Sequence, residues 1–254
     1  MNKQNPKIAA IIVNWNNPIY TVGAIRSLKQ NNYNELTMII ADNGSTDNSI
    51  KFIQEKEPSI KIIDIGANLG YGSAINYVYD SLDTKEYDFL LILNNDIEFD
   101  RCYLEKLVET LTKFGPKHII GSKIMYMSDK SKIWFLGGEI GPGAFQIKHS
   151  FIRNDDFDIS EPFTTDYITG CSMMLHIEDF AQLRFDDSFK MYGEDVDICL
   201  RASAIGFKCI VEPRSIAFHA ISASYSGNFS IKKNIMKFIA RIKVVYRNAI
   251  GAYN

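Results

Sequence analysis

A five-residue apolar run near the middle of the chain ends abruptly in three polar side chains. Residues 89–93 are Phe-Leu-Leu-Ile-Leu, and Asn94, Asn95 and Asp96 follow directly. A short run that is apolar throughout is typical of a strand buried on both faces, as in a parallel sheet. Ligands of such sheets bind beyond the carboxyl ends of the strands. Asp96 is therefore either a carboxylate that holds a cation against a diphosphate, or the cap of the helix that follows.

The same pattern occurs three times before that run. Residues 8–13, 36–41 and 60–65 are apolar stretches, and each precedes a polar or glycine-containing loop and a helix-forming segment. Strands that alternate with helices in this way form a mainly parallel sheet with helices on both faces. Residues 1–115 therefore predict an α/β layer of the kind that binds nucleotides.

The loops after the first two strands carry side chains that suit a nucleotide. Asn14, Trp15 and Asn16 offer an aromatic face for stacking and amides for the edge of a base. Asp42 stands at the end of the second strand, where an acidic residue commonly meets a ribose hydroxyl or a base. The alternative is structural: a capping loop whose Trp15 packs in the core.

The loop after the third strand contains several glycines but does not match a dinucleotide fingerprint. Gly66 and Gly70 are four residues apart, whereas the first two glycines of GxGxxG are two apart. The loop is either a tight turn or a segment whose backbone amides approach an anion at a helix start. The fingerprint is also missing after the first strand, which disfavours a dehydrogenase.

Composition and charge further narrow the class of protein to which this chain can belong. The 254 residues are 46% apolar, enough for the core of one large α/β domain or two small ones. A net charge of −2 provides no overall field for nucleic acid, and none is expected as a partner. The four cysteines lack CxxC spacing, which favours reduced core thiols in a cytosolic protein over a zinc site. We expect neither a signal peptide nor a transmembrane span.

After residue 116 the strand–helix alternation stops. Residues 118–127 predict a strand, and residues 208–211 and 215–218 predict two short ones. Gly170 lies within an apolar stretch, where a backbone that needs a close approach would require glycine. This half therefore predicts a different, mixed arrangement.

An acidic cluster begins the helix that is predicted to end near residue 205. Glu194 and Asp195 suit the positive end of the helix dipole, which is the structural interpretation. The functional one is a general base beside a cation that holds the leaving group. Arg201 lies four residues after Asp197, so we expect these two to form a structural pair.

His219 follows the apolar run 215–218, again at a strand-like end. A single histidine is usually an ordinary surface or core residue. Neutral imidazole can also complete a metal site begun by Asp96.

Residues 231–251 have the pattern of a basic amphipathic helix. The apolar residues fall within an arc of roughly 120° at helical spacing, and no acidic residue follows Glu212. The stripe itself slightly favours docking on the domain, whereas the one-signed charge favours an anionic membrane surface. The apolar positions are Ile231, Ile235, Phe238, Ile239, Ile242, Val245 and Tyr246, and the basic positions are Lys232, Lys233, Lys237, Arg241, Lys243 and Arg247.

Together, these segments resemble the family 2 glycosyltransferases with the GT-A fold, and within them the bacterial rhamnosyltransferase-like and galactofuranosyltransferase-like enzymes. Each motif is weak alone, but all occur in family order between residues 7 and 225. The motifs are 13–17 (VNWNN), 42–47 (DNGSTD), 68–72 (NLGYG), 93–97 (LNNDI), 169–173 (TGCSM), 192–197 (YGEDVD) and 218–219 (FH).

The resemblance implies one α/β catalytic domain of the GT-A fold over residues 1–225. Residues 1–115 would form a Rossmann-like nucleotide-binding half with a mainly parallel sheet. Residues 116–225 would continue it as a mixed acceptor-binding and catalytic half. Residues 226–254 would form the C-terminal helix by which relatives rest near the membrane.

The resemblance also implies site residues. The segment from Asn94 to Asp96 looks like the DxD motif with its first acid replaced, so Asp96 would be the principal ligand of Mg²⁺ or Mn²⁺, together with His219. Asp195 would be the general base, in a catalytic acidic pair with Glu194. Trp134 is our candidate for stacking on the acceptor. The expected nucleotide-binding residues are Asn14, Trp15, Asn16, Asp42, Asn68, Gly72, Asn94 and Asn95.

The expected function is inverting transfer of a sugar, with rhamnose favoured, from a dTDP- or UDP-linked donor to a hydroxyl of a bacterial surface polysaccharide or lipid-linked glycan. The expected location is the cytoplasm, with peripheral contact to the inner face of the plasma membrane through residues 231–250. The alternative is a non-catalytic sugar-nucleotide-binding domain of a larger polysaccharide synthase, which the replacement by Asn94 favours. The transferase requires Asp96, Asp195 and His219 to meet in one pocket.

Overall fold

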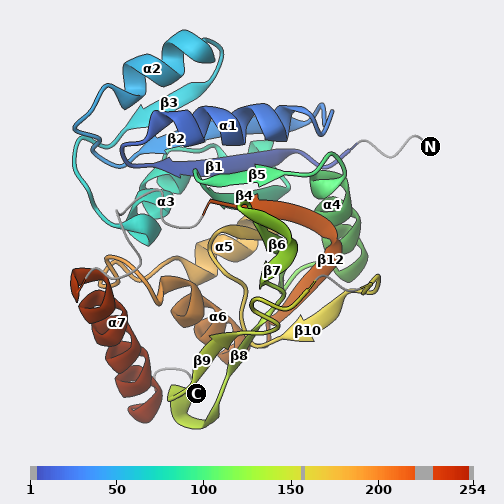
Figure 1. Cartoon of the computed structure of the whole chain (residues 1–254), viewed down its shortest axis with the longest axis vertical. Helices are drawn as coiled ribbons and strands as arrows, with labels where there is room; N and C mark the ends of the chain where they lie inside the picture. The colour runs from blue at the N-terminus through green and yellow to red at the C-terminus, as the bar shows by residue number, and fades with distance from the viewer. Residues whose placement is uncertain (1–4, 156–157, 221–230, 252–254) are drawn as a thin grey trace.

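The computed structural model describes residues 5–155, 158–220 and 231–251. The predicted boundary between residues 225 and 226 lies outside them. Figure 1 shows a curled sheet with helices around it. The elements are β1 (Ile8–Asn14), α1 (Pro18–Lys29), β2 (Leu36–Asp42), α2 (Ser49–Lys56), β3 (Lys61–Asp64), α3 (Tyr71–Asp80), η1 (Thr84–Glu86), β4 (Phe89–Asn94), β5 (Ile97–Phe99), α4 (Tyr103–Phe114), β6 (His118–Tyr126), β7 (Asp129–Phe135), β8 (Gly138–Ile140), η2 (Pro142–Ala144), β9 (Ile147–His149), β10 (Phe163–Thr165), β11 (Ser172–His176), α5 (Ile177–Leu183), α6 (Glu194–Ala204), β12 (Lys208–His219) and α7 (Ile231–Ala249).

The first half of the chain forms the predicted parallel sheet. β1 pairs in parallel with β2 and with β4, and β2 pairs in parallel with β3. Every residue of β1 is buried, as are the first five of β4, which matches strands covered on both faces. The polar residues that follow these strands therefore share one edge of the sheet.

The second half continues the same sheet in mixed directions, as expected. The strand order is β10-β12-β6-β11-β4-β1-β2-β3, with β5 on β12, β7 on β6, and a separate β8–β9 hairpin. β11 runs antiparallel to both β4 and β6, whereas β6 and β12 are parallel. One sheet therefore joins the two halves of the chain.

The prediction of two short strands over 208–211 and 215–218 is wrong, because both belong to the single strand β12. Its register with β6 shifts between Glu212 and Ile216, a β-bulge that includes Pro213. Proline cannot donate to a ladder and is tolerated at bulges. The strand therefore continues past the proline and delivers His219 to the far end of the sheet.

β5 is a short strand that the sequence did not predict. Its three residues pair antiparallel with the end of β12, with Ile97 opposite His219. The Ala220 N–H donates to the Asp96 carbonyl at 2.8 Å. Asp96 therefore lies beside β12, and the helix α4 begins only at Tyr103, so Asp96 is not its cap.

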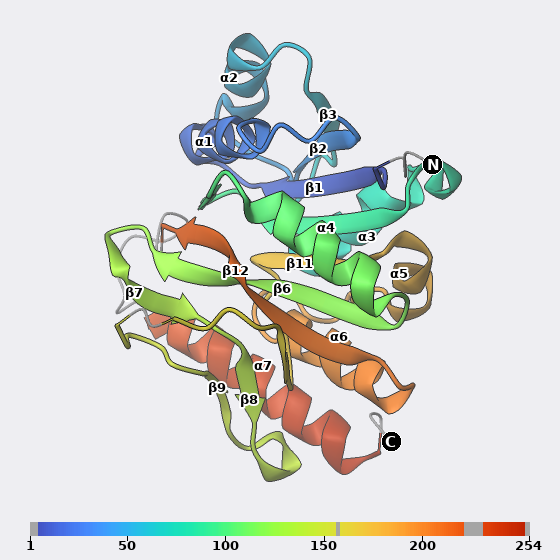
Figure 2. The same cartoon turned by 90° about the vertical axis from the view of Figure 1, so that its right-hand side faces the viewer.

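The helices cover the sheet on both faces. In Figure 2, α4 lies in front of the sheet and α5 and α6 lie behind it. The apolar stripe of α4 is fully buried, with Leu104, Leu107 and Leu111 packed on the sheet. Such burial, at about 25 cal/mol per Å² of apolar area, is the main stabilising contribution.

α7 is a helix in the predicted position, but its orientation contradicts docking through the apolar stripe. It buries Ala240 and Val244, whereas the large apolar residues of the stripe are between 52% and 64% exposed. Among the described residues, no helix combines the length and the apolar character that a bilayer span needs. The exposed residues are Ile235, Phe238, Ile239, Ile242, Tyr246 and Ile250.

Candidate active site

The polar edge of the sheet opens into one cavity of about 760 Å³. Residues from distant parts of the chain line it: Trp15 after β1, Asn43 after β2, Asp96 after β4, Asp195 in α6 and His219 at the end of β12. They meet because parallel strands end at the same edge and because β12 pairs with β5. The required meeting of positions 96, 195 and 219 in one pocket is therefore found.

Asp96 and His219 form a contacting pair in this cavity. Asp96 Oδ1 lies 3.1 Å from His219 Nε2, and the two residues are 7% and 8% exposed. The indole ring of Trp134 meets the imidazole edge-on, with centroids 4.3 Å apart. The second ring nitrogen, Nδ1, is buried without a hydrogen-bond partner within the described part of the chain. Buried polar atoms are normally hydrogen-bonded, so this imidazole is a candidate ligand.

The pair fits a divalent cation that is shared with a substrate. Carboxylate oxygens suit Mg²⁺ and Mn²⁺, and neutral imidazole is a common metal ligand. Within residues 5–155, 158–220 and 231–251, no group of three or more His, Cys, Asp or Glu side chains is arranged to hold a metal. A cation held by Asp96 and His219 would therefore need further oxygen ligands, as Mg²⁺ commonly takes from phosphates and water.

Glu194 and Asp195 are half-buried in the cavity wall at the start of α6. Asp195 accepts hydrogen bonds from the Gly170 N–H at 3.2 Å and from the Val196 N–H at 2.9 Å. Burial raises the pKa of Asp195, although these N–H groups oppose the shift. Burial, and then the charge of Asp195, raises the pKa of Glu194 to about 8. A carboxylate with a raised pKa is a better general base.

Asp197 is structural, as predicted. Arg201 Nε donates to its Oδ2 at 2.9 Å, and the Asp197 side chain is fully buried. Arg201 also donates to the carbonyls of Leu183 and Arg184, which end the preceding helix segment. The neighbouring Asp195 is thus left to face the cavity.

The Gly170 peptide is held from two sides. Its carbonyl accepts a hydrogen bond from Tyr71 Oη at 2.6 Å, while its N–H donates to Asp195. A Cβ at this position would lie 3.0 Å from the Tyr71 ring. The need for glycine at position 170 was expected from the sequence. The hydrogen bond from Tyr71 was not, because Tyr71 and Gly170 are 99 residues apart.

Asn14 and Asp42 join the first two loops and do not line the cavity. Asn14 Nδ2 donates to Asp42 Oδ2 at 2.7 Å and to Ser45 Oγ at 3.0 Å. The two residues are 0% and 1% exposed, so the amide and the carboxylate satisfy each other. Direct contact of either with a nucleotide stays a prediction; in this structure they position the loops.

Trp15 and Asn16 follow in the same loop. Trp15 is half-buried and lines the cavity, so its packing in the core is not complete. Asn16 has a left-handed backbone with φ of 57° and accepts a hydrogen bond from the Thr46 N–H at 2.9 Å. Its amide oxygen is therefore engaged with the second loop.

Asn43 was not among the site residues predicted from the sequence, and it links the second and third loops. Its Nδ2 donates to Asn68 Oδ1 at 3.3 Å, and its Oδ1 accepts from the Leu69 N–H at 2.9 Å. Asn68 itself lines the cavity. Gly72 does not line the cavity. A Cβ at this position would lie 2.5 Å from the Cβ of Phe185. The structure requires that glycine for packing.

Asn94 and Asn95 both line the cavity but have different partners. Asn94 Nδ2 donates to Cys171 Sγ at 3.2 Å. Asn95 Nδ2 donates to Thr21 Oγ1 at 3.0 Å. Neither amide is hydrogen-bonded to Asp96 in these contacts. Asn94, which stands in place of the first acid of the DxD motif, therefore does not support the Asp96 carboxylate through them.

Trp134 lies in the cavity wall between two histidines. Its ring meets His149 at 4.7 Å and His219 at 4.3 Å between centroids, edge-on in both cases. The Trp134 carbonyl is 3.2 Å from His149 Nδ1. Burial lowers the pKa of His149. Trp134 remains half-buried at the wall, where an aromatic face can meet a sugar.

The cationic side chains at the rim of the cavity were also not predicted as site residues. Lys190 donates to the Leu69 carbonyl at 3.2 Å, and Lys237 and Arg241 of α7 reach the cavity as well. No local pattern identifies them, since the side of α7 that meets the domain is decided by tertiary packing. The acidic pair and these cations together make a cavity with charges of both signs.

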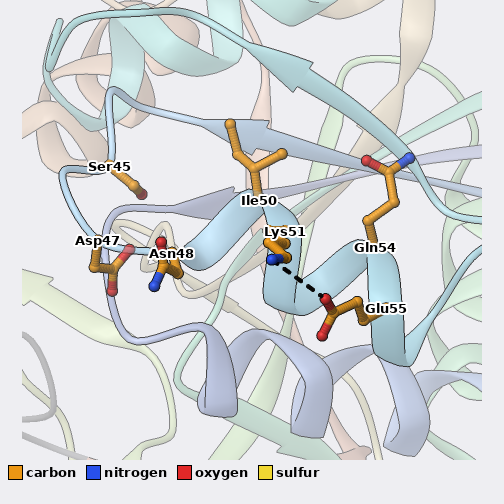
Figure 3. A pocket seen from close by; sticks show the side chains of 7 residues that line it. All are labelled: Ser45, Asp47, Asn48, Ile50, Lys51, Gln54 and Glu55. Atoms are coloured by element: carbon orange, nitrogen blue, oxygen red, sulfur yellow. Dashed lines mark ion pairs between the residues drawn. The ribbon is translucent and has the colours of Figure 1, made fainter.

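A second hollow lies beside α2, away from this chemistry. Figure 3 shows its lining, where Lys51 and Glu55 form an ion pair at 4.0 Å. Both side chains are largely exposed, and such pairs contribute little. We therefore assign the site to the cavity at the strand ends.

Comparison with known proteins finds rhamnosyltransferases among the relatives of this chain. The chain is 25% identical over 213 residues to an N-acetylglucosaminyl-diphospho-decaprenol L-rhamnosyltransferase of Mycobacterium tuberculosis, covering 72% of this chain and 66% of that protein. It is 24% identical over 203 residues to the rhamnosyltransferase WbbL of Escherichia coli K12, covering 71% and 74%. The chain thus matches slightly less than two thirds of the mycobacterial relative.

Solved structures share the fold. GalNAc-T7 with UDP, GalNAc and Mn²⁺ superposes with a TM-score of 0.74 at 15% identity, over 96% of this chain and 48% of that one. The mannosyltransferase PcManGT of Pyrobaculum calidifontis, with GDP-Man and Mn²⁺, gives 0.67 at 14% identity, over 98% and 65%. The expected GT-A fold is therefore confirmed.

The family model of glycosyl transferase family 2 matches residues 9–183, which include the nucleotide-side loops, Asp96 and Gly170. With the sheet, the cavity and the relatives described above, this chain belongs to glycosyl transferase family 2.

Proposed function

We propose that this protein is an inverting glycosyltransferase that moves a sugar, with rhamnose favoured, from a nucleoside-diphosphate donor to a hydroxyl of a bacterial surface polysaccharide or lipid-linked glycan. The observation that carries the proposal is the cavity that contains both the Asp96–His219 pair and the Glu194–Asp195 pair. The rhamnosyltransferase relatives support the choice of sugar.

The donor occupies the end of the cavity near the first three loops. Trp15 stacks on the base, and the amides of Asn43 and Asn68 contact the nucleotide. The donor is a dTDP- or UDP-linked sugar. Support comes from the position of these side chains in the lining and from the hydrogen bond between the two amides. Asp42 and Asn14 hold the loops in place from beneath.

Asp96 and His219 would hold Mg²⁺ or Mn²⁺. When bound, the cation would supply Lewis-acid neutralisation of the negative charge on the departing nucleoside diphosphate. Support comes from the 3.1 Å contact, the unpartnered Nδ1 of His219 and the Mn²⁺ in the structural neighbours.

Asp195 acts as the general base. Its carboxylate takes the proton of the acceptor hydroxyl while that oxygen forms a bond to the anomeric carbon. The bond between this carbon and the diphosphate oxygen breaks, and the nucleoside diphosphate leaves with the electron pair. A single displacement from the opposite face inverts the configuration. Gly170, fixed by Tyr71, keeps the carboxylate directed into the cavity.

The substitution Asp195→Asn tests the assignment. It keeps the shape of the side chain but removes the base, so transfer should fall about 10²-fold or more while nucleotide affinity is retained. Transfer to a glycan acceptor and nucleotide binding by calorimetry are the two measurements. Asp158→Asn, an exposed aspartate, is the matched control. Normal turnover in Asp195→Asn would overturn the role of this residue.

Donor turnover by the purified protein, with and without EDTA, tests the reaction itself. A metal-dependent transferase loses activity with EDTA and recovers it with Mg²⁺ or Mn²⁺. A protein that binds the nucleotide-sugar without turning over any donor would instead be the non-catalytic domain of a larger synthase.

The exposed face of α7 rests on the inner surface of the plasma membrane. Its large apolar side chains are more than half exposed, and no acidic residue lies in the sequence after Glu212. Such a helix binds the headgroup region through apolar burial and attraction to anionic lipids. The substitutions Ile239→Gln and Ile242→Gln should reduce sedimentation with anionic vesicles. A dimer in solution that these variants abolish, without vesicle binding by the wild type, would assign the face to a second copy.

A further inference from the structure

α7 presents two opposite faces, and the inner one belongs to the cavity. Lys237, Ala240, Arg241 and Val244 line the cavity and recur at intervals of three and four residues. At about 100° per residue they form one side of the helix, and the exposed apolar residues lie on the other, roughly 180° away. The helix therefore presents cations to the cavity and apolar side chains to the exterior.

The two cations are placed by contacts with the cavity rim. Lys237 lies over the Tyr192 ring, with Nζ 5.3 Å from the centroid. Arg241 donates to the carbonyl of Phe145, next to η2, against which α7 packs. Both remain exposed, so they can still contact a ligand. Their contacts position the cationic groups at the mouth of the cavity.

These cations lie at the end of the cavity away from the nucleotide loops. Figure 2 shows α7 beside β8 and β9, at the opposite end of the molecule from β1, β2 and β3. Exposed apolar side chains, Phe145 and Ile152, flank the same mouth, and Ile152 lines the cavity. The mouth therefore combines positive charge with an apolar rim that is continuous with α7.

We propose that Lys237 and Arg241 bind the diphosphate of an amphiphilic acceptor, in which that diphosphate joins a sugar to a long isoprenoid chain. Paired cations match a diphosphate, and hydrogen bonds between charged groups are about twice as strong as neutral ones. The apolar rim and the outer face of α7 match the hydrocarbon chain. The sugar then extends past Trp134 toward Asp195, inside the cavity.

This inference rests on the proposed function, because it names the acceptor of that reaction. It adds a binding site that neither Asp96 nor the nucleotide loops supply. The Asp195 carboxylate would repel a diphosphate placed near it, so the anionic group is held at the rim while only the neutral sugar reaches the base.

The test measures binding without turnover. Geranylgeranyl diphosphate, geranylgeraniol and UDP are titrated against the full chain by calorimetry. The double variant Lys237→Gln/Arg241→Gln should bind geranylgeranyl diphosphate about tenfold or more weakly, with UDP affinity changed less than about twofold. Lys237→Arg/Arg241→Lys should retain binding of the isoprenoid diphosphate, since it preserves both charges.

Lys243→Gln is the control on the same helix, because Lys243 contacts Ser188 and the Phe189 ring and does not line the cavity. Equal loss of UDP affinity in the double variant would assign the cations to the donor and overturn the proposal. Equal wild-type affinity for the alcohol and the diphosphate would also overturn it. Absence of sugar transfer with intact isoprenoid-diphosphate binding would overturn the proposed function alone.

Discussion

α4 and α7 are both amphipathic helices, but they direct their apolar faces in opposite directions. α4 buries Leu107 completely against the sheet, whereas α7 leaves Ile239 59% exposed. The inner face of α7 instead combines the buried Ala240 and Val244 with cations: Arg247 pairs with Asp186 and with Asp197, the latter at 3.4 Å. A periodic stripe thus establishes that a helix has an apolar face, but not what that face contacts.

The difference follows from the surface that each helix meets. α4 lies on β6, β11 and β12 and buries its leucines there. Its polar contacts with these strands are hydrogen-bonded pairs, as between Thr110 and Glu212. α7 lies over the cavity and over the acidic segment that ends in α6, where carboxylates attract its cations. Burying the stripe of α7 there would have placed apolar side chains against charged groups, which is costly.

The largest expected effect comes from truncating the two stripes. Leu107→Ala in α4 should lower the free energy of unfolding by about 2–5 kcal/mol, because a cavity replaces a fully buried side chain. Ile239→Ala in α7 should change it by no more than about 0.5 kcal/mol. Urea denaturation of both variants measures the difference. Similar losses in the two would mean that α7 also buries its stripe in solution.

A smaller effect is expected from the inner face of α7. Arg247→Ala removes contacts to Asp186 and Asp197 and should cost about 1–3 kcal/mol, since Asp197 is fully buried. Hydrogen exchange should accelerate in α7 but not in α4. Lys106→Ala, which breaks an exposed pair with Glu109 on α4, is the control and should cost less than about 1 kcal/mol. Unchanged exchange in α7 would argue that its polar face does not hold it.

Titration should sharpen the contrast further. Burial raises the pKa of Glu194, in the cavity wall, to about 8, above its value near 4.5 in the unfolded chain. Its contribution to stability is therefore complete below about pH 4.5 and is lost as the pH rises through about 8. The free energy of unfolding should fall over this range, and Glu194→Gln should remove most of that fall. Leu107→Ala should keep the wild-type pH profile; a profile unchanged by Glu194→Gln would contradict the raised pKa.

The smallest expected effect concerns Tyr71, whose influence on the site is indirect. Tyr71→Phe removes the hydrogen bond that holds the Gly170 carbonyl, and so loosens the N–H that lowers the pKa of Asp195. Transfer should fall a few-fold, about 1 kcal/mol in activation free energy. The pH profile of transfer should also move to higher pH. A reduced transfer rate with an unchanged pH profile would indicate that Tyr71 has a purely structural role.

Much of the first half could be predicted from local sequence. β1, β2 and β4 coincide with apolar runs, and the Asp197–Arg201 pair follows from helical spacing alone. β5 and the continuity of β12 could not be predicted, because β5 forms by pairing with the end of β12 and the proline-containing bulge lies in the pairing of β12 with β6. The contact between Asp96 and His219 depends on that pairing.

The site shows the same division. Asp96 and His219 were identified at strand ends and Asp195 at a helix start, and all three line one cavity. The same logic did not distinguish Asn68, which lines it, from Asn14, which is buried beneath it. Asn14 ends β1 and Asn68 lies in the loop before α3, and which of the two faces the cavity depends on how the loops stack.

The sequence by itself determined which segments are strands and helices in the nucleotide-binding half, and which residue types stand at the strand ends. These features arise from interactions within a few residues, such as apolar alternation and helical spacing. Only the tertiary structure decided that β12 brings His219 to Asp96, and that α7 directs its cations inward. Those outcomes depend on contacts between groups 123 and 96 residues apart in the sequence, whose energies no local pattern contains.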